Sequence, residues 1–289
     1  MPDHSTPVSP PVAALAQVAD WPELNEPIEM VRDALTSLRW HQALRRRIPE
    51  CAAESRVRGA QASGELEGAR LPVDMVRELM AGVRPWPQQV DPVESVMRGV
   101  VAATAASEEV RSRVLGAPAQ ALARLHVAAV GDRVDAAAVG RPRATGEPCG
   151  ELVDIGPLPG AAEVSDRLDL LGEVIRGHAS IPGVILAAVA HAEVATVRPF
   201  THGNGVVARA LERSLIQATG LDPTGVAVTE IGHFRQGMPA YVGALTAYAT
   251  GSREGVRLWL VHSCDALVAA AAEGRAVADA VLAGRLPQA

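Results

Sequence analysis

The sequence predicts a mainly α-helical protein, and three observations support that fold class. Apolar side chains recur at helical spacing through most of the 289 residues. The segment 184–190 is apolar on every side, which is typical of a helix at the centre of a core. Prolines and glycines separate the helical segments, and the stretch 131–159, which is rich in both, changes character.

The expected elements follow from this spacing in chain order. A Pro-rich tail over 1–12 is expected to be disordered, and helices are expected at about 28–47, 52–66, 73–80, 93–106, 107–115, 117–130, 161–177, 182–196, 206–219, 235–250 and 253–283. Gly68 ends the second helix, and the prolines of 82–92 cannot continue the third. The segment 146–156, GEPCGELVDIG, predicts a short β-hairpin.

Composition and charge exclude several function classes. The chain carries 33 acidic and 27 basic residues, all of the latter Arg, for a net charge of −6. A dedicated nucleic-acid binder usually carries a basic face, so we expect no nucleic-acid partner. Cys51, Cys149 and Cys264 are widely spaced, which indicates neither a disulfide framework nor a zinc knuckle and fits a reducing cytosol. The N-terminus lacks the basic region of a signal peptide, and the apolar stretch 181–190 is too short to cross a bilayer. We therefore expect a cytoplasmic protein with no membrane partner.

The most informative segment is 198–209, RPFTHGNGVVAR, where a buried helix ends and another begins. Gly203 and Gly205 let the backbone approach a ligand closely, and the free N–H groups of the next helical turn attract an anion. Arg209 follows one helical turn after Gly205, so its guanidinium can return to the same point. The pattern predicts a phosphate cradle, and an ordinary helix–helix turn is the plain alternative.

The whole string resembles the signature of the Fic (Fido) family, His-Pro-Phe-x-Asp/Glu-Gly-Asn-Gly-Arg-x-x-Arg. The residues that match in register are Pro199, Phe200, Gly203, Asn204, Gly205 and Arg209. The resemblance covers about 95–250 and implies a Fic-type helical bundle with an N-terminal helical extension. It implies AMP transfer from ATP to protein hydroxyls, and it makes the segment after Gly140, with the expected hairpin, a flap that docks a target protein.

A second motif stands ahead of that core. Ser63-Gly64-Glu65-Leu66-Glu67-Gly68 resembles the family's inhibitory helix, Ser/Thr-x-x-x-Glu-Gly/Asn, here at about 55–68. Ser63 and Glu67 are four residues apart and share a helix face. The resemblance implies that Glu67 pairs with Arg209 and obstructs the nucleotide γ-phosphate. We accordingly divide the chain into an N-terminal tail and helical region, 1–92, and a Fic-like core with C-terminal helices, 93–289.

Three of the four chemically active motif positions differ from the family pattern. Arg198 stands where the family has its general base, and a guanidinium does not release its proton in a protein. His202 replaces the acid that holds Mg²⁺, which prefers oxygen ligands, so the sequence argues against Mg²⁺ here. An imidazole suits a softer metal such as Zn²⁺, but one His without partner ligands is not a metal site, so we expect no metal. Val206 replaces the first motif arginine.

These changes predict a Fic-type protein that binds ATP, another nucleotide or phosphate but has impaired or lost catalysis and a regulatory role. The expected anion-binding residues are Gly203, Asn204, Gly205, Val206, Arg209 and Arg198, and the inhibitory residues are Ser63, Glu67 and Gly68. One alternative is an active transferase that uses His202 as a base, although a loop imidazole bonded to nearby backbone is the plainer interpretation of that residue. Another is a helical interaction protein with no small ligand. In each case the protein target or regulator is not identified by the sequence, nor is the oligomeric state.

Overall fold

The computed structural model describes residues 9–88, 91–131, 133–151 and 154–286, and all regular secondary structure in this part of the chain is helical. The helices are α1 (Pro10–Val18), α2 (Pro22–Arg39), α3 (Ile48–Leu66), α4 (Val73–Met80), α5 (Pro92–Val110), α6 (Pro118–Val130), α7 (Ala161–Arg176), α8 (Gly183–Val197), α9 (Asn204–Ala218), α10 (Thr229–Gln236), α11 (Met238–Ala249) and α12 (Arg253–Leu282). Short 3₁₀ turns are η1 (Gln42–Arg45), η2 (Ala136–Ala138) and η3 (His178–Ser180). The predicted mainly α-helical class is confirmed.

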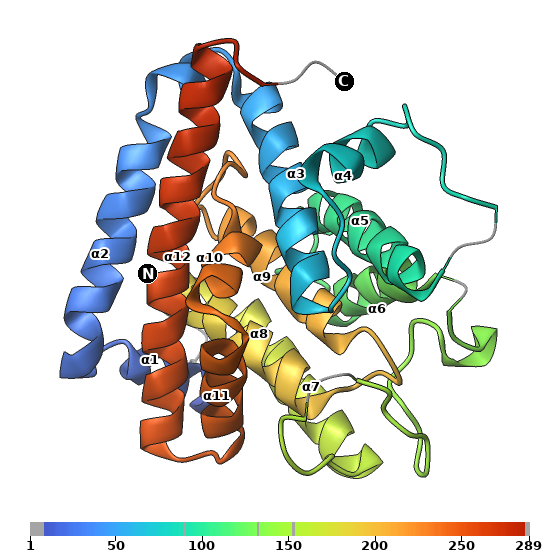
Figure 1. Ribbon diagram of the computed structural model, residues 1–289. Coiled ribbons are helices and arrows are strands. Elements are labelled where there is room, and N and C mark those ends of the chain that lie inside the picture. The colour runs from blue at the N-terminus through green and yellow to red at the C-terminus, as the bar shows by residue number, and fades with distance from the viewer. Residues whose placement is uncertain (1–8, 89–90, 132, 152–153, 287–289) are drawn as a thin grey trace, which may run out of the picture.

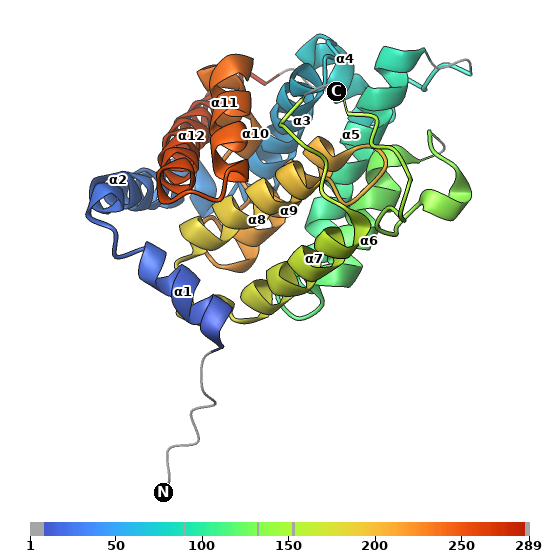
Figure 2. The ribbon, with the colours of Figure 1, turned by 90° about the horizontal axis from the view of Figure 1, so that it is seen from below.

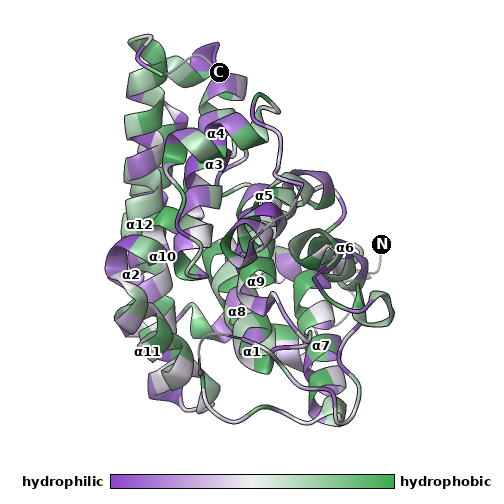
Figure 3. Cartoon of the chain, turned by 45° about the vertical axis from the view of Figure 1, so that its right-hand side comes forward, coloured by the Kyte–Doolittle hydropathy of each residue, from purple (hydrophilic) through white to green (hydrophobic). Residues whose placement is uncertain are grey.

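Helices α8 and α9 form the centre of the molecule, with the others packed around them (Figures 1 and 2). Nearly every side chain of α8 is buried, as its unbroken apolar sequence predicts. On one side α12 runs beside α2 and packs on α10 and α11, and the buried Trp259 indole donates a hydrogen bond of 2.7 Å to the Ala188 carbonyl of α8. In Figure 3, hydrophobic and hydrophilic bands alternate along α2 and α12, which is the pattern of helices with one packed face.

Helix α12 is the one described helix that is long and apolar enough to cross a membrane by length and composition. Over half of its most apolar window is buried against the rest of the protein, however, and it packs along α2, α10 and α11. Its apolar character is therefore that of a core helix.

Several helix boundaries differ from the sequence prediction, because local breakers and caps decide them. The helix expected at 93–106 continues without a break to Val110 as α5, which starts at a capping box formed by Asp91 and Glu94, and the rest of the helix expected at 107–115 is a turn. The helix expected at 235–250 is divided into α10 and α11 at Gly237, whose φ of +87° is left-handed. The tail expected over 1–12 extends only to residue 9 at most, since α1 begins at Pro10, and residues 1–8 lie outside the described part.

The predicted β-hairpin at 146–156 is wrong for every described residue of that segment, none of which is in a strand. The chain instead forms an irregular loop, whose backbone bonds to other parts of the protein rather than to a facing strand. The Gly150 N–H donates to the Thr201 carbonyl at 2.8 Å, and Glu147 turns back to the Ala144 N–H at 2.6 Å. We call 140–160 the flap loop, of which residues 152 and 153 lie outside the described part.

Candidate anion site

The loop between α8 and α9 is shaped by two left-handed residues and one asparagine. Arg198 ends α8 with φ +49°, and Gly203 precedes α9 with φ +78°. The Asn204 side chain fixes the loop between them, because its Oδ1 accepts from the Phe200 N–H at 2.8 Å and its Nδ2 donates to the Phe200 carbonyl at 2.9 Å. Phe200 is buried and stacks on His126 with ring centroids 3.9 Å apart. The loop is thus held rigidly against the core.

The first turn of α9 presents backbone donors toward the mouth of this loop. The first helical hydrogen bond of α9 runs from Val207 N–H to the Gly203 carbonyl at 3.0 Å. The amides of Asn204, Gly205 and Val206 precede this first helical donor and therefore have no acceptor within the helix. Together with the helix dipole, such amides favour a bound anion.

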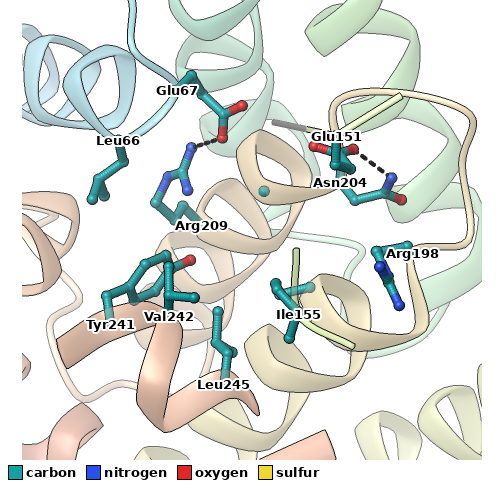
Figure 4. Close-up of a pocket in the computed structure, with 12 residues that line it drawn as sticks. Leu66, Glu67, Glu151, Ile155, Arg198, Asn204, Arg209, Tyr241, Val242 and Leu245 are labelled. Carbon is teal, nitrogen blue, oxygen red and sulfur yellow. Dashed lines mark hydrogen bonds and ion pairs between the residues drawn. The ribbon is translucent and has the colours of Figure 1, made fainter. Parts of the chain in front are cut away.

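Arg209 lies beside this turn with its guanidinium held by α3, as the sequence predicts. Its Nη2 is 2.6 Å from Glu67 Oε1, and its Nε donates to Ser63 Oγ at 2.9 Å. Glu67 closes the end of α3, and Gly68 follows with φ +74°. The expected contact between Glu67 and Arg209 is confirmed, and Figure 4 shows it beside the pocket.

The absence of a side chain at Gly205 makes this contact fit. A Cβ built there would lie 2.5 Å from Glu67 Oε1 and 3.2 Å from Arg209 Nη1. Burial alone would lower the pKa of Arg209, but the Glu67 carboxylate and the Tyr241 phenol outweigh it and raise the pKa. The guanidinium therefore stays charged in the interior and is matched by an internal anion.

Arg198, expected near the anion, has a different role. Its Nη2 donates to the carbonyls of Gly156 and Pro157 at 2.8 and 2.6 Å, and its Nε donates to Thr196 at 3.2 Å. In Figure 4 its guanidinium points away from Arg209. The side chain thus ties the flap loop to the end of α8, because three backbone carbonyls accept hydrogen bonds from its guanidinium.

His202 is exposed at the mouth of the loop, and Gly150 of the flap loop packs against its ring. A Cβ at Gly150 would come within 2.3 Å of His202 Nε2, so only glycine permits this approach. His202 lines a cavity of about 330 Å³ together with Glu67, Glu151 and Gly203.

Glu151 is a site residue that sequence reasoning missed. Its Oε1 accepts from the Asn204 backbone N–H at 2.8 Å and from Asn204 Nδ2 at 2.6 Å (Figure 4). A carboxylate of the flap loop thus lies at the N-terminal end of α9. Nothing in the spacing of 149–151 signals this contact, because it spans 53 residues and depends on how the flap loop folds.

The cavity between these side chains is small. A volume of about 40 Å³ is enclosed by residues that include Glu67, Glu151, Asn204, Arg209 and Tyr241. This is about the space of one water molecule, whereas small-molecule pockets measure roughly 300–1,000 Å³. An anion larger than a water molecule therefore fits between these side chains only if one of them moves.

A second buried polar group lies behind Tyr241. His191 Nδ1 and His233 Nε2 both lie within 3 Å of Glu212 Oε2, at 2.7 and 2.9 Å, and His191 Nε2 is 2.7 Å from the Tyr241 hydroxyl. Burial raises the pKa of Glu212, but His233 and His191 outweigh it and lower the pKa, while burial lowers the pKa of His191 to about 4. His191 is thus a packed polar residue of α8, grouped with Glu212 and His233.

Two groups of residues bring possible metal ligands together. His191, Glu212 and His233 have ligand atoms within 4.8 Å of one another, yet their short mutual hydrogen bonds already satisfy the histidines. At the mouth of the anion site, His202 offers an imidazole where Mg²⁺ needs oxygen, and the carboxylates of Glu67 and Glu151 are committed to Arg209 and Asn204. These residues do not fit a Mg²⁺ ion as they stand.

Comparison with known proteins gives structural but no sequence matches. No family model matches the sequence, and no curated protein matches it either. A solved structure of Fic-1 from C. elegans, residues 134–508, shares 20% identity with a TM-score of 0.64, covering 95% of this chain and 75% of that one.

Two bacterial structures agree with this result. A Fic family protein from Desulfovibrio desulfuricans shares 20% identity with a TM-score of 0.61, covering 99% of this chain and 79% of that one. A Fic domain containing signaling protein from Bacteroides thetaiotaomicron shares 15% identity with a TM-score of 0.61, covering 91% of this chain and all of that one. The resemblance of the motif at 198–209 and the likeness of the whole chain agree: this protein has the fold of the Fic-domain proteins.

Proposed function

We propose that this chain binds a phosphate-bearing ligand, of the class of ATP, at the N-terminus of α9, and that Glu67 keeps the site closed. The observation that carries the proposal is the internal carboxylate on Arg209, 2.6 Å from its Nη2 and directly above Gly205. A buried arginine beside first-turn amides that have no acceptor within the helix suits a phosphate, because both donor sets favour the same charge. Glu67 supplies a negative charge there from within the chain.

The same residues support impaired catalysis. The resemblance to Fic proteins places the general base at position 198, where Arg198 is always protonated and is bonded to flap carbonyls. General-base catalysis contributes about 10²–10⁴-fold in rate, so its loss leaves little AMP transfer by that route. We therefore propose a regulatory protein that senses a nucleotide or phosphate and acts on a protein partner in the cytoplasm.

One observation favours a second candidate, an active transferase. His202 is exposed and lines the 330 Å³ cavity beside the anion site, so an imidazole able to act as a base lies at the entrance to that site. The purified chain and its Glu67→Gln variant, incubated with labelled ATP and lysate protein, separate the two candidates. Covalent label that disappears in His202→Ala would establish the transferase, whereas the regulatory proposal expects no label.

The binding proposal is tested by thermal shift with inorganic phosphate, ADP and ATP, each with and without Mg²⁺ or Mn²⁺. Binding to the folded state raises the melting temperature by mass action, and we expect a larger rise for Glu67→Gln than for the native chain. Glu65→Gln is the matched control, because Glu65 lies on the same turn of α3 but pairs with Arg70 and Gln61. If no ligand raises the melting temperature of any of the three proteins, the binding proposal is wrong. The loop then only connects two helices, and the alternative of a helical interaction protein with no small ligand is favoured.

A further inference from the structure

The Glu151 carboxylate holds the part of the anion site that Glu67 does not reach. Glu67 engages Arg209 from the end of α3, whereas Glu151 engages the backbone and side-chain nitrogens of Asn204 from the flap loop. In Figure 4 the two carboxylates approach the start of α9 from different elements. Glu67 thus takes the arginine, and Glu151 takes the first of the amides that a phosphate would use.

This contact differs from an ordinary helix cap. A capping side chain normally belongs to the residue before the helix, which here is Gly203 and has no side chain. The acceptor instead comes from a residue 53 positions earlier. A distant carboxylate on the first amide of α9 has the geometry of a bound anion rather than that of a local turn.

The flap loop is fastened on both sides of Glu151, so the carboxylate is positioned rather than merely near. On one side Gly150 N–H donates to Thr201, and on the other Arg198 holds the carbonyls of Gly156 and Pro157. Arg143 adds a bond of 2.8 Å from its Nε to the Arg198 carbonyl. All three anchors attach to the motif segment itself, at 198–201.

The position is electrostatically costly for a carboxylate. Burial raises the pKa of Glu151, the charge of Glu67 raises it further, and the two hydrogen bonds from Asn204 only partly offset this. Because the charged form of Glu151 is unfavourable in this position, we expect that an external anion can replace it on the Asn204 donors. Removing either carboxylate also relieves the repulsion on the other.

We propose that Glu151 is a second internal anion, which occupies the Asn204 donors of the site as Glu67 occupies Arg209. The inference rests on the proposed function, since both carboxylates would exclude the same phosphate. A ligand must then displace both, and replacing Glu67 alone opens only half of the site. The regulation resides in the flap loop as well as in α3, so a partner that moves the flap loop would admit the ligand.

The test measures ATP and inorganic phosphate affinity by isothermal titration without metal, for Glu67→Gln, Glu151→Gln and the double variant. Glutamine keeps an oxygen that can accept from Asn204, so the flap loop keeps its place while the charge is lost. The ligand competes with the charge-assisted hydrogen bonds that the two carboxylates make to the site. We therefore expect Glu151→Gln to tighten binding about tenfold or more, and the double variant to bind most tightly. Glu151→Ala checks the result without any acceptor at that position.

Glu147→Gln is the matched control, because Glu147 is in the same loop but pairs with Arg141. If Glu67→Gln gains affinity and Glu151→Gln gains no more than Glu147→Gln, the Glu151 inference is wrong and the proposed function stands. If the folded double variant binds neither ATP nor phosphate, the proposed function fails and the inference fails with it.

Discussion

Two arginines on α9, one helical turn apart, show how similar ion pairs can serve different ends. Arg213 and Arg209 are both buried, and both are contacted by α3, through Ser55 and Ser63 respectively. Arg213 pairs with Glu230 through two bonds of 2.9 and 2.8 Å, and both side chains are nearly inaccessible. Arg209 makes one bond to Glu67, whose side chain is 16% exposed.

The difference lies in what surrounds the carboxylate. Glu230 is on α10, inside the packing of α3 and α12, so no external anion can reach Arg213. Glu67 ends α3 at the edge of a cavity and faces the open turn of α9. The first pair is therefore a fixed part of the core, and the second is a pair whose anion can be exchanged.

Breaking the fixed pair has the largest expected effect. Glu230→Gln leaves Arg213 charged and unmatched in the core, which costs about 3–5 kcal/mol of unfolding free energy for a buried pair. Chemical denaturation measures the loss. A loss below about 1 kcal/mol would show that solvent reaches Arg213 and would remove the contrast with Arg209.

Replacing the exchangeable arginine affects binding more than folding. In Arg209→Met the methylene stem still packs, and Glu67 can turn toward solvent, so we expect a modest loss of stability. Phosphate loses its charged partner, and affinity for ATP should fall about tenfold to a hundredfold, as measured by titration. Unchanged affinity would place the ligand elsewhere.

Two glycines give a matched comparison of rigidity. A Cβ at Gly59 would lie 2.6 Å from both Arg213 Nη2 and Glu230 Oε2, and one at Gly205 would lie 2.5 Å from Glu67 Oε1. Because the Arg213 pair cannot yield, Gly59→Ala should cost about 1–3 kcal/mol by overpacking.

Glu67 can move, so Gly205→Ala should have the smallest effect on stability, below about 1 kcal/mol. It should also speed amide hydrogen exchange at the end of α3. Equal losses of stability in the two variants would indicate that both pairs are equally confined.

The sequence predicted the parts of the site that local rules control. Helical spacing places Ser63 and Glu67 on one face, and Gly205 and Arg209 one turn apart. The contact of Arg209 with Ser63 and Glu67 was then predictable from the motif resemblance. The role of Arg198 and the contact of Glu151 were not predictable, because both depend on the path of the flap loop. That loop has no periodic pattern, and its expected hairpin fails because its backbone groups bond to Thr201 and Arg198 instead. The cluster of His191, Glu212 and His233 likewise joins three helices that only tertiary packing brings together.

The exchange of one anion for another at Arg209 is tested most directly by melting Glu67→Gln and Glu230→Gln side by side, with and without saturating ATP. Both variants should be less stable than the native chain when no ligand is present. Added ATP should restore Glu67→Gln toward native stability, because its phosphate takes the vacated place on Arg209, and should leave the deficit of Glu230→Gln unchanged. Equal rescue of the two variants, or rescue of neither, would contradict the account.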